Sequence, residues 1–216
     1  VSKVGKIKTL GDGSICGVDT CRFRPDRSKY SAIRRANGLD KSDFIVLYLG
    51  RMVKDKGIFD ALECLMIAHK KYKNIVFWTA GPDEEGLVDQ LKNMARSSGI
   101  RFKYFGVVPS TVEFFQSADL FIMPSKREGF GSVLIEAAAC GLPCLCYKTH
   151  GVVDAVEENV TGLLASYCDV EDLTKKLLSV FENPDHLQLM ARNCRERAKK
   201  KFPEERLVKA LREELS

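Results

Sequence analysis

The sequence predicts an α/β protein with a doubly wound parallel sheet and additional helices at its C-terminus. Short apolar runs that stop at Gly or Pro recur along the chain, and helical patterns separate them. The runs lie at 44–49, 75–80, 102–105, 120–123 and 142–147. Strand and helix therefore alternate about five times, which is typical of a parallel sheet with helices on both faces.

Local patterns place the individual elements. The run 44–49 is entirely apolar, as expected for a strand buried on both faces of a sheet. We expect a weak strand at 6–10, a brief one at 161–164, and helices at 31–37, 58–71, 84–96, 110–117, 132–140, 170–182, 184–200 and 203–215. The chain then divides into a linker with a first strand (1–30), the sheet domain (31–200) and a C-terminal helix (201–216).

Length and composition fit one large domain with a substantial core. Of the 216 residues, 45% are hydrophobic and 29% are charged, which is ordinary for a globular protein. No apolar run reaches the roughly 18 residues that a membrane-spanning helix needs, and no signal peptide is recognisable. We therefore expect a cytoplasmic protein. Because the chain begins with Val, we also expect it to be a piece of a longer protein.

The eight cysteines favour small buried side chains in a reducing compartment, because several stand inside apolar runs. A zinc site is the alternative, since Cys140, Cys144, Cys146 and His150 lie close together in the sequence. Their spacing, C-x3-C-x-C-x3-H, matches no common zinc motif and straddles a helix end and a strand. We expect no metal.

Positive charge gathers near the C-terminus of a chain whose net charge is +5. Between 192 and 201, only Glu196 opposes the basic residues, which are Arg192, Arg195, Arg197, Lys199, Lys200 and Lys201. One interpretation is a solvated helix face, and the other is peripheral contact with the anionic inner face of a membrane. Aromatic residues are not interleaved with these charges, so we expect no nucleic-acid partner.

The stretch 120–141 has the pattern of a strand, a glycine loop and a helix. The apolar run stops at Pro124, and Gly129-Phe130-Gly131 precedes a helical run that begins at Ser132. Glycines let a backbone approach a ligand closely, and the free N–H groups of a first helical turn favour an anion. The loop therefore suits a phosphate group.

Two carboxylates bracket this loop. Glu128 precedes the glycines, and Glu136 lies inside the helix, where its side chain leans back toward the helix N-terminus. We expect both to face one pocket, where they would accept hydrogen bonds from hydroxyl pairs. Phosphate and hydroxyl pairs together describe a sugar nucleotide. The alternative is structural, because Glu near a helix start and Gly-x-Gly in a loop are both common.

Cations are expected at the same edge of the sheet. Ligands of such sheets bind at the carboxyl ends of the strands, where Gly50, Gly81 and Gly106 stand. Arg51 and Lys56 follow the first of these glycines, and two cations suit a diphosphate. Ordinary surface charge is the alternative for both residues.

The glycines at 11–17 invite a nicotinamide-dinucleotide interpretation, which we reject. They are spaced G-x-G-x3-G instead of G-x-G-x-x-G, and no amphipathic helix follows them.

With these residues placed, the sequence resembles the C-terminal, nucleotide-sugar-binding domain of retaining GT-B glycosyltransferases of glycosyltransferase family 4 (group 1), which is Rossmann-like. The resemblance covers nearly the whole chain. Its motifs are Gly17-Val18-Asp19 with Phe23 and Pro25, Gly50-Arg51-x4-Lys56-Gly57, Gly81-Pro82, Gly106-Val107-Val108, Ala118-Asp119-Leu120, Pro124-Ser125-x-x-Glu128-Gly129-Phe130-Gly131 with Glu136 completing E-x7-E, Gly141-Leu142-Pro143 and Thr161-Gly162-Leu163-Leu164. Two departures concern loop shape: Cys16 stands where members usually carry Asn, and Asp83 where they often carry Gly.

The resemblance implies a role for each site residue. Arg51 and Lys56 would hold the pyrophosphate of the donor and stabilise the leaving group. Glu128 would position the donor sugar and completes the catalytic set. The implied nucleotide-sugar-binding residues are Gly50, Gly81, Val107, Val108, Gly129, Phe130, Gly131, Ser132 and Glu136, the last of which would accept from the ribose hydroxyls. No metal or other cofactor is implied, and the breadth of the family favours a UDP-sugar as donor.

The resemblance also implies partners. The active site of such enzymes lies between two domains, so an N-terminal domain with the acceptor site is the expected partner of this chain. The helix at 203–215 is expected to lean on that domain through Leu207, Val208, Leu211 and Leu215.

We expect transfer of a sugar, with retention, to a glycan or lipid-linked acceptor in bacterial surface polysaccharide synthesis. This chain alone is expected to bind the nucleotide but to transfer little sugar. The main alternative is a non-catalytic module that binds a nucleotide or phosphosugar. An epimerase or a phosphorylase is a weaker alternative, because the acid and base groups or the cofactor lysine that they need are not recognisable.

Overall fold

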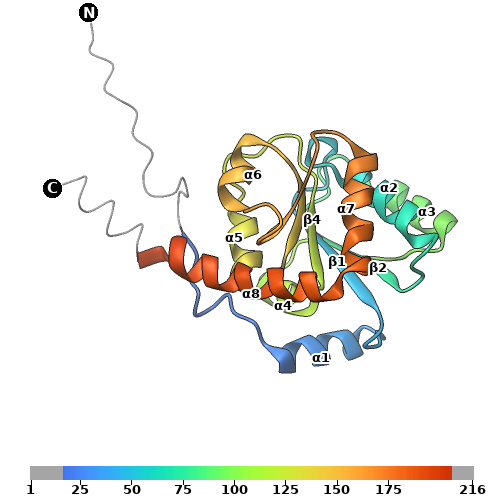
Figure 1. Ribbon diagram of the computed structural model, residues 1–216. Helices are drawn as coiled ribbons and strands as arrows, with labels where there is room; N and C mark the ends of the chain where they lie inside the picture. The colour runs from blue at the N-terminus through green and yellow to red at the C-terminus, as the bar shows by residue number, and fades with distance from the viewer. Residues whose placement is uncertain (1–16, 206–216) are drawn as a thin grey trace, which may run out of the picture.

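Six strands form one parallel sheet in the order β3-β2-β1-β4-β5-β6. This is a computed structural model, which describes residues 17–205. The strands are β1 (Phe44–Leu49), β2 (Ile75–Ala80), β3 (Arg101–Tyr104), β4 (Leu120–Met123), β5 (Cys144–Tyr147) and β6 (Gly162–Ala165). Helices cover both faces (Figure 1), which confirms the predicted doubly wound, Rossmann-like architecture with helices at its C-terminal end.

The helices are α1 (Arg27–Ala36), η1 (Lys54–Lys56, a 3₁₀ turn), α2 (Ile58–His69), α3 (Val88–Ser98), α4 (Val112–Ser117), α5 (Ser132–Ala139), α6 (His150–Ala155), α7 (Val170–Glu182) and α8 (Pro184–Lys201). Helices α2, α3 and α7 share one apolar core with the sheet, and α4, α5 and α6 share the other. Successive residues of a strand point to opposite faces. In β1, Leu47 therefore enters one core and Val46 the other.

Hydrogen bonds from backbone N–H groups to aspartate side chains mark where two helices start. The carboxylate of Asp26 accepts hydrogen bonds from the backbone N–H groups of Ser28 and Lys29, so α1 begins at Arg27 and not at 31. The carboxylate of Asp83 accepts from the N–H groups of Leu87 and Val88 at 2.8 and 3.2 Å. Helix α3 therefore begins at Val88 instead of 84, and Asp83 has a structural role in this chain.

The region expected to be a linker packs into the core that contains α4, α5 and α6. The N–H of Val18 donates to the carbonyl of Phe202 at 2.8 Å, and Val18 and Phe23 are both buried. Helix α6, of six residues, was not predicted. The predicted strand at 6–10 and nearly all of the predicted helix at 203–215 lie outside the described residues.

A buried ion pair ties α1 to the amino end of the sheet. Arg34 is only 2% exposed, and its Nη1 lies 2.9 Å from Oδ2 of Asp119. The same Oδ2 accepts from the N–H of Ile45 at 2.7 Å, and Tyr30 donates its hydroxyl to Oδ1 at 2.9 Å. The Ala118-Asp119-Leu120 motif is therefore structural here.

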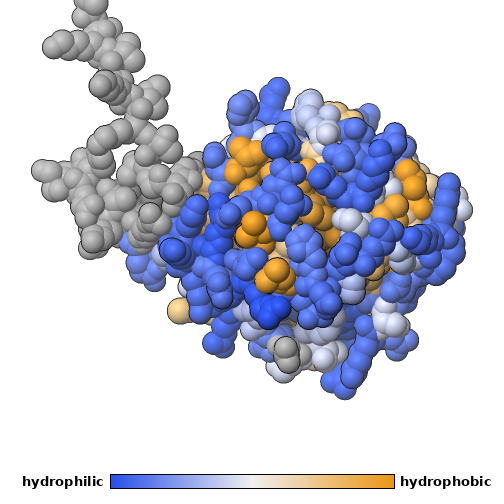
Figure 2. All heavy atoms as spheres, viewed as in Figure 1, coloured by the Kyte–Doolittle hydropathy of each residue, from blue (hydrophilic) through white to orange (hydrophobic). Residues whose placement is uncertain are grey.

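Part of the basic segment of α8 serves the fold. Arg195 donates to the carbonyls of Phe23 and Ala139 at 2.7 and 2.8 Å, and Arg197 donates to that of Ala155 at 2.6 Å. These contacts favour a structural role for the two arginines over membrane contact. The face that carries α7 and α8 is mainly hydrophilic, with separate hydrophobic spots (Figure 2). Within residues 17–205, no helix has both the length and the apolar character required to cross a membrane.

Candidate functional site

A cleft of about 430 Å³ opens at the carboxyl ends of the strands. The strand order reverses between β1 and β4, which pair although two strands intervene in the sequence. In open α/β sheets this switch point is where ligands bind. We call this site the central cleft; its lining is Tyr48, Leu49, Gly50, Arg51, Lys56, Ala80, Gly81, Pro82, Val107, Val108, Thr111, Met123, Glu128 and Val133.

The loop after β1 is held tightly against the loop after β4. Gly57 has a φ of +70°, and a Cβ atom there would lie 1.9 Å from the carbonyl oxygen of Pro124. The N–H of Lys126 donates to the carbonyl of Asp55 at 2.9 Å. Tyr48 also holds the loop after β1, because its hydroxyl donates to the carbonyl of Arg51 at 3.0 Å. Burial, helped by the negative charge of Glu128, raises the pKa of Tyr48 and keeps its hydroxyl protonated.

The two cations of the central cleft each contact a carboxylate. Lys56 Nζ lies 2.6 Å from Glu128 Oε1 and also donates to the carbonyl of Arg127 at 3.2 Å. Arg51 Nη1 lies 3.0 Å from Glu84 Oε2. The first pair is 21% and 15% exposed, whereas the second is 55% and 45% exposed. Lys56 is therefore held firmly, and Arg51 is held by a weak surface pair.

The opposite wall of the central cleft is apolar. Val107 follows β3 and is 75% exposed, although it is a large hydrophobic residue. Gly81 brings the neighbouring loops together: its N–H donates to the carbonyl of Gly106 at 2.8 Å. A Cβ atom on Gly81 would lie 1.9 Å from the carbonyl oxygen of Gly50. The cleft thus has a charged side and an apolar side.

Glu136 is not among the lining residues of the central cleft. Burial raises the pKa of Glu136, while the positive charge of Arg22 and a hydrogen bond with Thr111 act in the opposite direction. Thr111 does line the cleft. Glu136 therefore lies near a lining residue of the central cleft without lining it itself.

The glycine loop also differs from the expectation. Gly131 adopts the left-handed conformation, with φ at +72°, and starts α5. The ring of Phe130 is buried against Phe202, with the ring centroids 5.6 Å apart, so only its backbone can face a ligand. Gly129, Gly131 and Ser132 do not line the central cleft.

The structure thus brings together seven of the predicted site residues: Gly50, Arg51, Lys56, Gly81, Val107, Val108 and Glu128. Sequence reasoning missed Tyr48 and Thr111. Tyr48 stands inside an apolar run, so the sequence indicates only a buried core residue there. No local sequence pattern indicates that Thr111 is part of a site.

The cysteines of the considered zinc motif are part of the apolar core. Cys140, Cys144 and Cys146 are buried there, whereas His150 is exposed. Burial raises the pKa of the Cys140 thiol to about 12, so the neutral thiol prevails at physiological pH. In the described part of the chain, no group of three or more His, Cys, Asp or Glu side chains is placed to hold a metal ion.

Comparison with known proteins places the chain in a family. Residues 29–201 match the family described as "Glycosyl transferases group 1". The chain is 28% identical to the capsular polysaccharide biosynthesis glycosyltransferase CapM of Staphylococcus aureus over 203 residues, which is 94% of this chain and 53% of that protein. It is 32% identical to a D-inositol 3-phosphate glycosyltransferase of Rhodococcus jostii over 185 residues, covering 81% of this chain and 40% of that protein.

Solved structures share the fold. Anabaena HepE, determined in complex with UDP and glucose, superposes with a TM-score of 0.84 at 23% identity, covering 92% of this chain and 55% of HepE. The C-terminal domain of the group 1 glycosyl transferase LpcC from Francisella tularensis superposes with a TM-score of 0.76 at 19% identity, covering 87% of this chain and 99% of that domain. The chain spans about half the length of CapM and HepE. The chain therefore belongs to the glycosyl transferases of group 1 and has the fold of the C-terminal domain of a GT-B enzyme.

Proposed function

We propose that the central cleft binds a nucleoside diphosphate sugar, with UDP as the nucleotide, and that this chain is the donor-binding half of a retaining, metal-independent glycosyltransferase. One observation carries the proposal: two cations from the loop after β1 and a carboxylate from the loop after β4 meet in one cleft at the switch point of the sheet.

Each part of the donor has a matching surface. The diphosphate would replace the carboxylates that now contact Arg51 and Lys56. The exposed apolar side chain of Val107 offers a surface for the flat base. The ribose hydroxyls would lie toward Thr111 and Glu136, and the sugar toward Glu128.

The transfer reaction depends more on stabilising the negative charge of the leaving group than on proton transfer by a side chain. The bond between the anomeric carbon and the phosphate oxygen breaks, and UDP leaves with the electron pair. The acceptor hydroxyl oxygen bonds to the same face of the anomeric carbon, and its proton passes to a phosphate oxygen of the leaving UDP. Arg51 and Lys56 would stabilise the charge that develops on that phosphate. Glu128, released from Lys56 when the diphosphate binds, would position the donor sugar and would not act as a general base.

The relatives support the class of donor and product. HepE binds UDP and glucose, and CapM is named for capsular polysaccharide biosynthesis. We infer that the acceptor is a glycan or lipid-linked saccharide of a bacterial surface polysaccharide. Because the chain spans about half of these relatives, we further propose an N-terminal partner domain that carries most of the acceptor site.

A thermal-shift series tests the donor proposal. A ligand that binds only the folded state raises the midpoint of unfolding. We expect UDP-sugars to raise it more than GDP- or ADP-sugars do. No shift with any nucleotide sugar would refute the donor site.

A further inference from the structure

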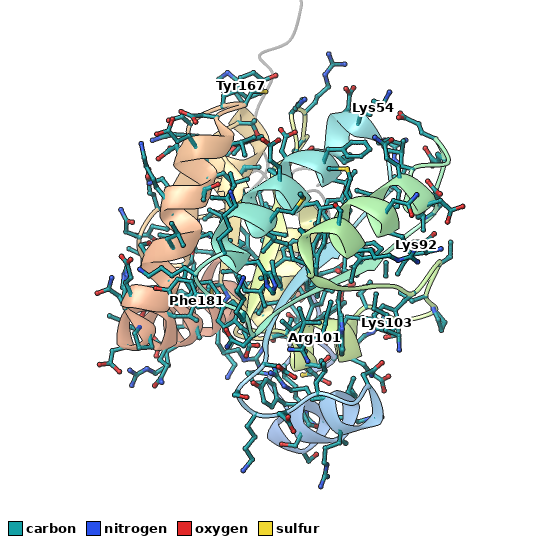
Figure 3. All side chains as sticks on the ribbon, turned by 90° about the vertical axis from the view of Figure 1, so that its right-hand side faces the viewer. Lys54, Lys92, Arg101, Lys103, Tyr167 and Phe181 are labelled. Carbon is teal, nitrogen blue, oxygen red and sulfur yellow. The ribbon has the colours of Figure 1, made fainter. Side chains whose placement is uncertain are left out.

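A second cleft, of about 500 Å³, lies at the carboxyl ends of β4, β5 and β6. We call it the lateral cleft; its lining is Lys126, Lys148, Thr149, His150, Val153 and Tyr167. It opens at the same end of the molecule as the central cleft. In Figure 3, Tyr167 lies at the top with Lys54 of η1, whereas Arg101, at the start of β3, lies lower.

Positive charge exceeds negative charge around the lateral cleft. Lys148 Nζ lies 3.1 Å from Glu158, but that carboxylate is shared with Lys176 at 3.6 Å. Lys126 Nζ lies 4.0 Å from Asp60, which also accepts the hydroxyl of Tyr147 at 2.9 Å. Among the lining residues, Lys126 and Lys148 are cations and none is a carboxylate, so the cleft favours an anion.

Thr149 offers a buried hydroxyl without a partner. Its Oγ1 is inaccessible to solvent and makes no hydrogen bond to the described residues. The backbone of Thr149 is extended, and its side chain does not cap α6. Burying an unpaired hydroxyl destabilises a fold. Thr149 itself lines the lateral cleft, so a rotation about its χ1 bond would turn the hydroxyl toward a ligand oxygen there and supply the missing partner.

An apolar platform completes the lateral cleft. The side chain of Tyr167 is 59% exposed and that of Val153 is 39% exposed, although both are large and hydrophobic. The Tyr167 ring packs edge-on against Tyr147, with the centroids 6.4 Å apart, and the rest of the ring is open to solvent. An exposed aromatic face next to cations fits the C–H face of a sugar ring that carries an anionic group.

We propose that the lateral cleft binds a phosphorylated sugar, with its phosphate against Lys148 and Thr149 and its ring against Tyr167. Lys126, which follows β4, also lines the lateral cleft and adds to its positive charge.

Its place in the fold indicates what this ligand does. The segment after β4 separates the two clefts, because Glu128 lines the central cleft and Lys126 the lateral one. Gly151 packs so closely on this segment that a Cβ atom would lie 1.9 Å from the carbonyl oxygen of Gly129. A phosphosugar in the lateral cleft would therefore lie beside the sugar end of the donor. As an assignment of the acceptor end, the proposal rests on the proposed function.

Amide chemical shifts of the 216-residue chain test the proposal. The chain is first mixed with excess UDP to fill the central cleft, and then titrated with glucose 1-phosphate, glucose or inorganic phosphate. We expect glucose 1-phosphate to shift the amides of Lys148, Thr149 and Tyr167 and to bind more tightly than either half-ligand. Absence of these shifts would overturn the proposal. If inorganic phosphate bound as tightly as glucose 1-phosphate, the lateral cleft would bind a phosphate alone, and the assignment of a sugar would be wrong.

A matched pair of variants provides the control. Lys71 resembles Lys148, since it is 61% exposed and forms a 3.0 Å pair with Glu182, but it stands beyond α2 at the other end of the sheet. Lys148→Ala should weaken glucose 1-phosphate binding about tenfold, because a charge-assisted hydrogen bond is lost. Lys71→Ala should leave the affinity unchanged. Equal losses in the two variants would contradict the assignment.

Thr149→Val separates binding from folding. Removing an unpaired buried hydroxyl should leave the unfolding midpoint the same or higher, while the phosphosugar binds more weakly. Unchanged phosphosugar affinity in this variant would exclude Thr149 from the site. UDP binding is recorded for every variant. If the unmodified chain did not bind UDP, the assignment of the central cleft as the donor site would be refuted, whereas the phosphosugar result would still stand.

Discussion

Lys56 Nζ and Glu128 Oε1 are 2.6 Å apart, although the two residues are separated by 72 positions in the sequence. The pair joins the loop after β1 to the loop after β4, and both side chains are mostly buried. A donor diphosphate that binds Lys56 would have to compete with this carboxylate. The pair therefore shapes the central cleft and sets how easily it accepts a phosphate.

Glu128→Gln should separate these two effects. Because the amide is neutral, Lys56 would be released to a diphosphate, and we expect UDP to bind at least about fivefold more tightly, since this pair is less exposed than surface pairs worth roughly 0.2–1 kcal/mol. The preference for UDP-glucose over UDP should disappear, because the carboxylate that positions the sugar is gone. Calorimetry with both ligands measures this. Glu182→Gln, in the remote pair with Lys71, is the control. Weaker UDP binding by Glu128→Gln would show that the carboxylate supports the phosphate site instead.

Glu84→Gln should free Arg51 in a similar but smaller way. The pair is exposed, and such pairs contribute roughly 0.2–1 kcal/mol, so UDP should bind about two- to threefold more tightly. The gain should fade at high salt, because salt screens exposed charges. Glu113→Gln, from the exposed pair with Lys29, should change nothing. A loss of affinity on removal of Glu84 would mean that Glu84 holds Arg51 in its binding position.

Gly57→Ala should destabilise the fold severely. Its Cβ atom would overlap the carbonyl of Pro124, and the left-handed backbone adds about 1–2 kcal/mol for any residue with a Cβ. Gly86 has a similar φ of +66° but no atom within 4 Å of a Cβ. Gly86→Ala therefore isolates the backbone cost. Chemical denaturation should show a clearly larger loss for Gly57→Ala, and equal losses would contradict the close packing of the two loops.

Glu136 should make stability depend on pH. Burial raises its pKa above the ordinary 4.5, so the folded state holds the proton more tightly than the unfolded chain does. The stabilising effect of the protonated form is present below that ordinary value and is lost as the pH rises through the raised pKa. Glu136→Gln should thus unfold at a higher temperature than the unmodified chain at pH 7, and the difference should shrink toward pH 4.5. A difference that does not vary with pH would argue against a partly buried carboxyl at this position.

The same variant tests the link to the ribose. Glu136→Gln should weaken UDP binding, but it should not change the binding of a ligand that lacks the ribose hydroxyls. Equal weakening for both ligands would show that Glu136 acts only through Thr111 and the fold.

The strands and the position of the site follow from the sequence because both depend on local or topological rules. The run at 44–49 is apolar throughout, and the loop after it must lie at the carboxyl edge of a parallel sheet. The contact between Lys56 and Glu128 depends on long-range packing, so only the structure reveals it. The burial of Phe130 against Phe202 and the link from Glu136 to Thr111 have the same origin. Helices α1 and α3 start at other residues than the sequence predicts. In each case one aspartate, Asp26 or Asp83, accepts hydrogen bonds from backbone N–H groups at the start of the helix.

The most direct test is a calorimetric titration of UDP into the Arg51→Ala, Lys56→Ala double variant. Each charge-assisted hydrogen bond contributes about 1.5–3 kcal/mol, so the affinity should fall by more than roughly a hundredfold. Lys54→Ala, which removes a neighbouring lysine that does not line the central cleft, should bind UDP as the unmodified chain does. Unchanged UDP affinity in the double variant would contradict the assignment of the central cleft as the donor site.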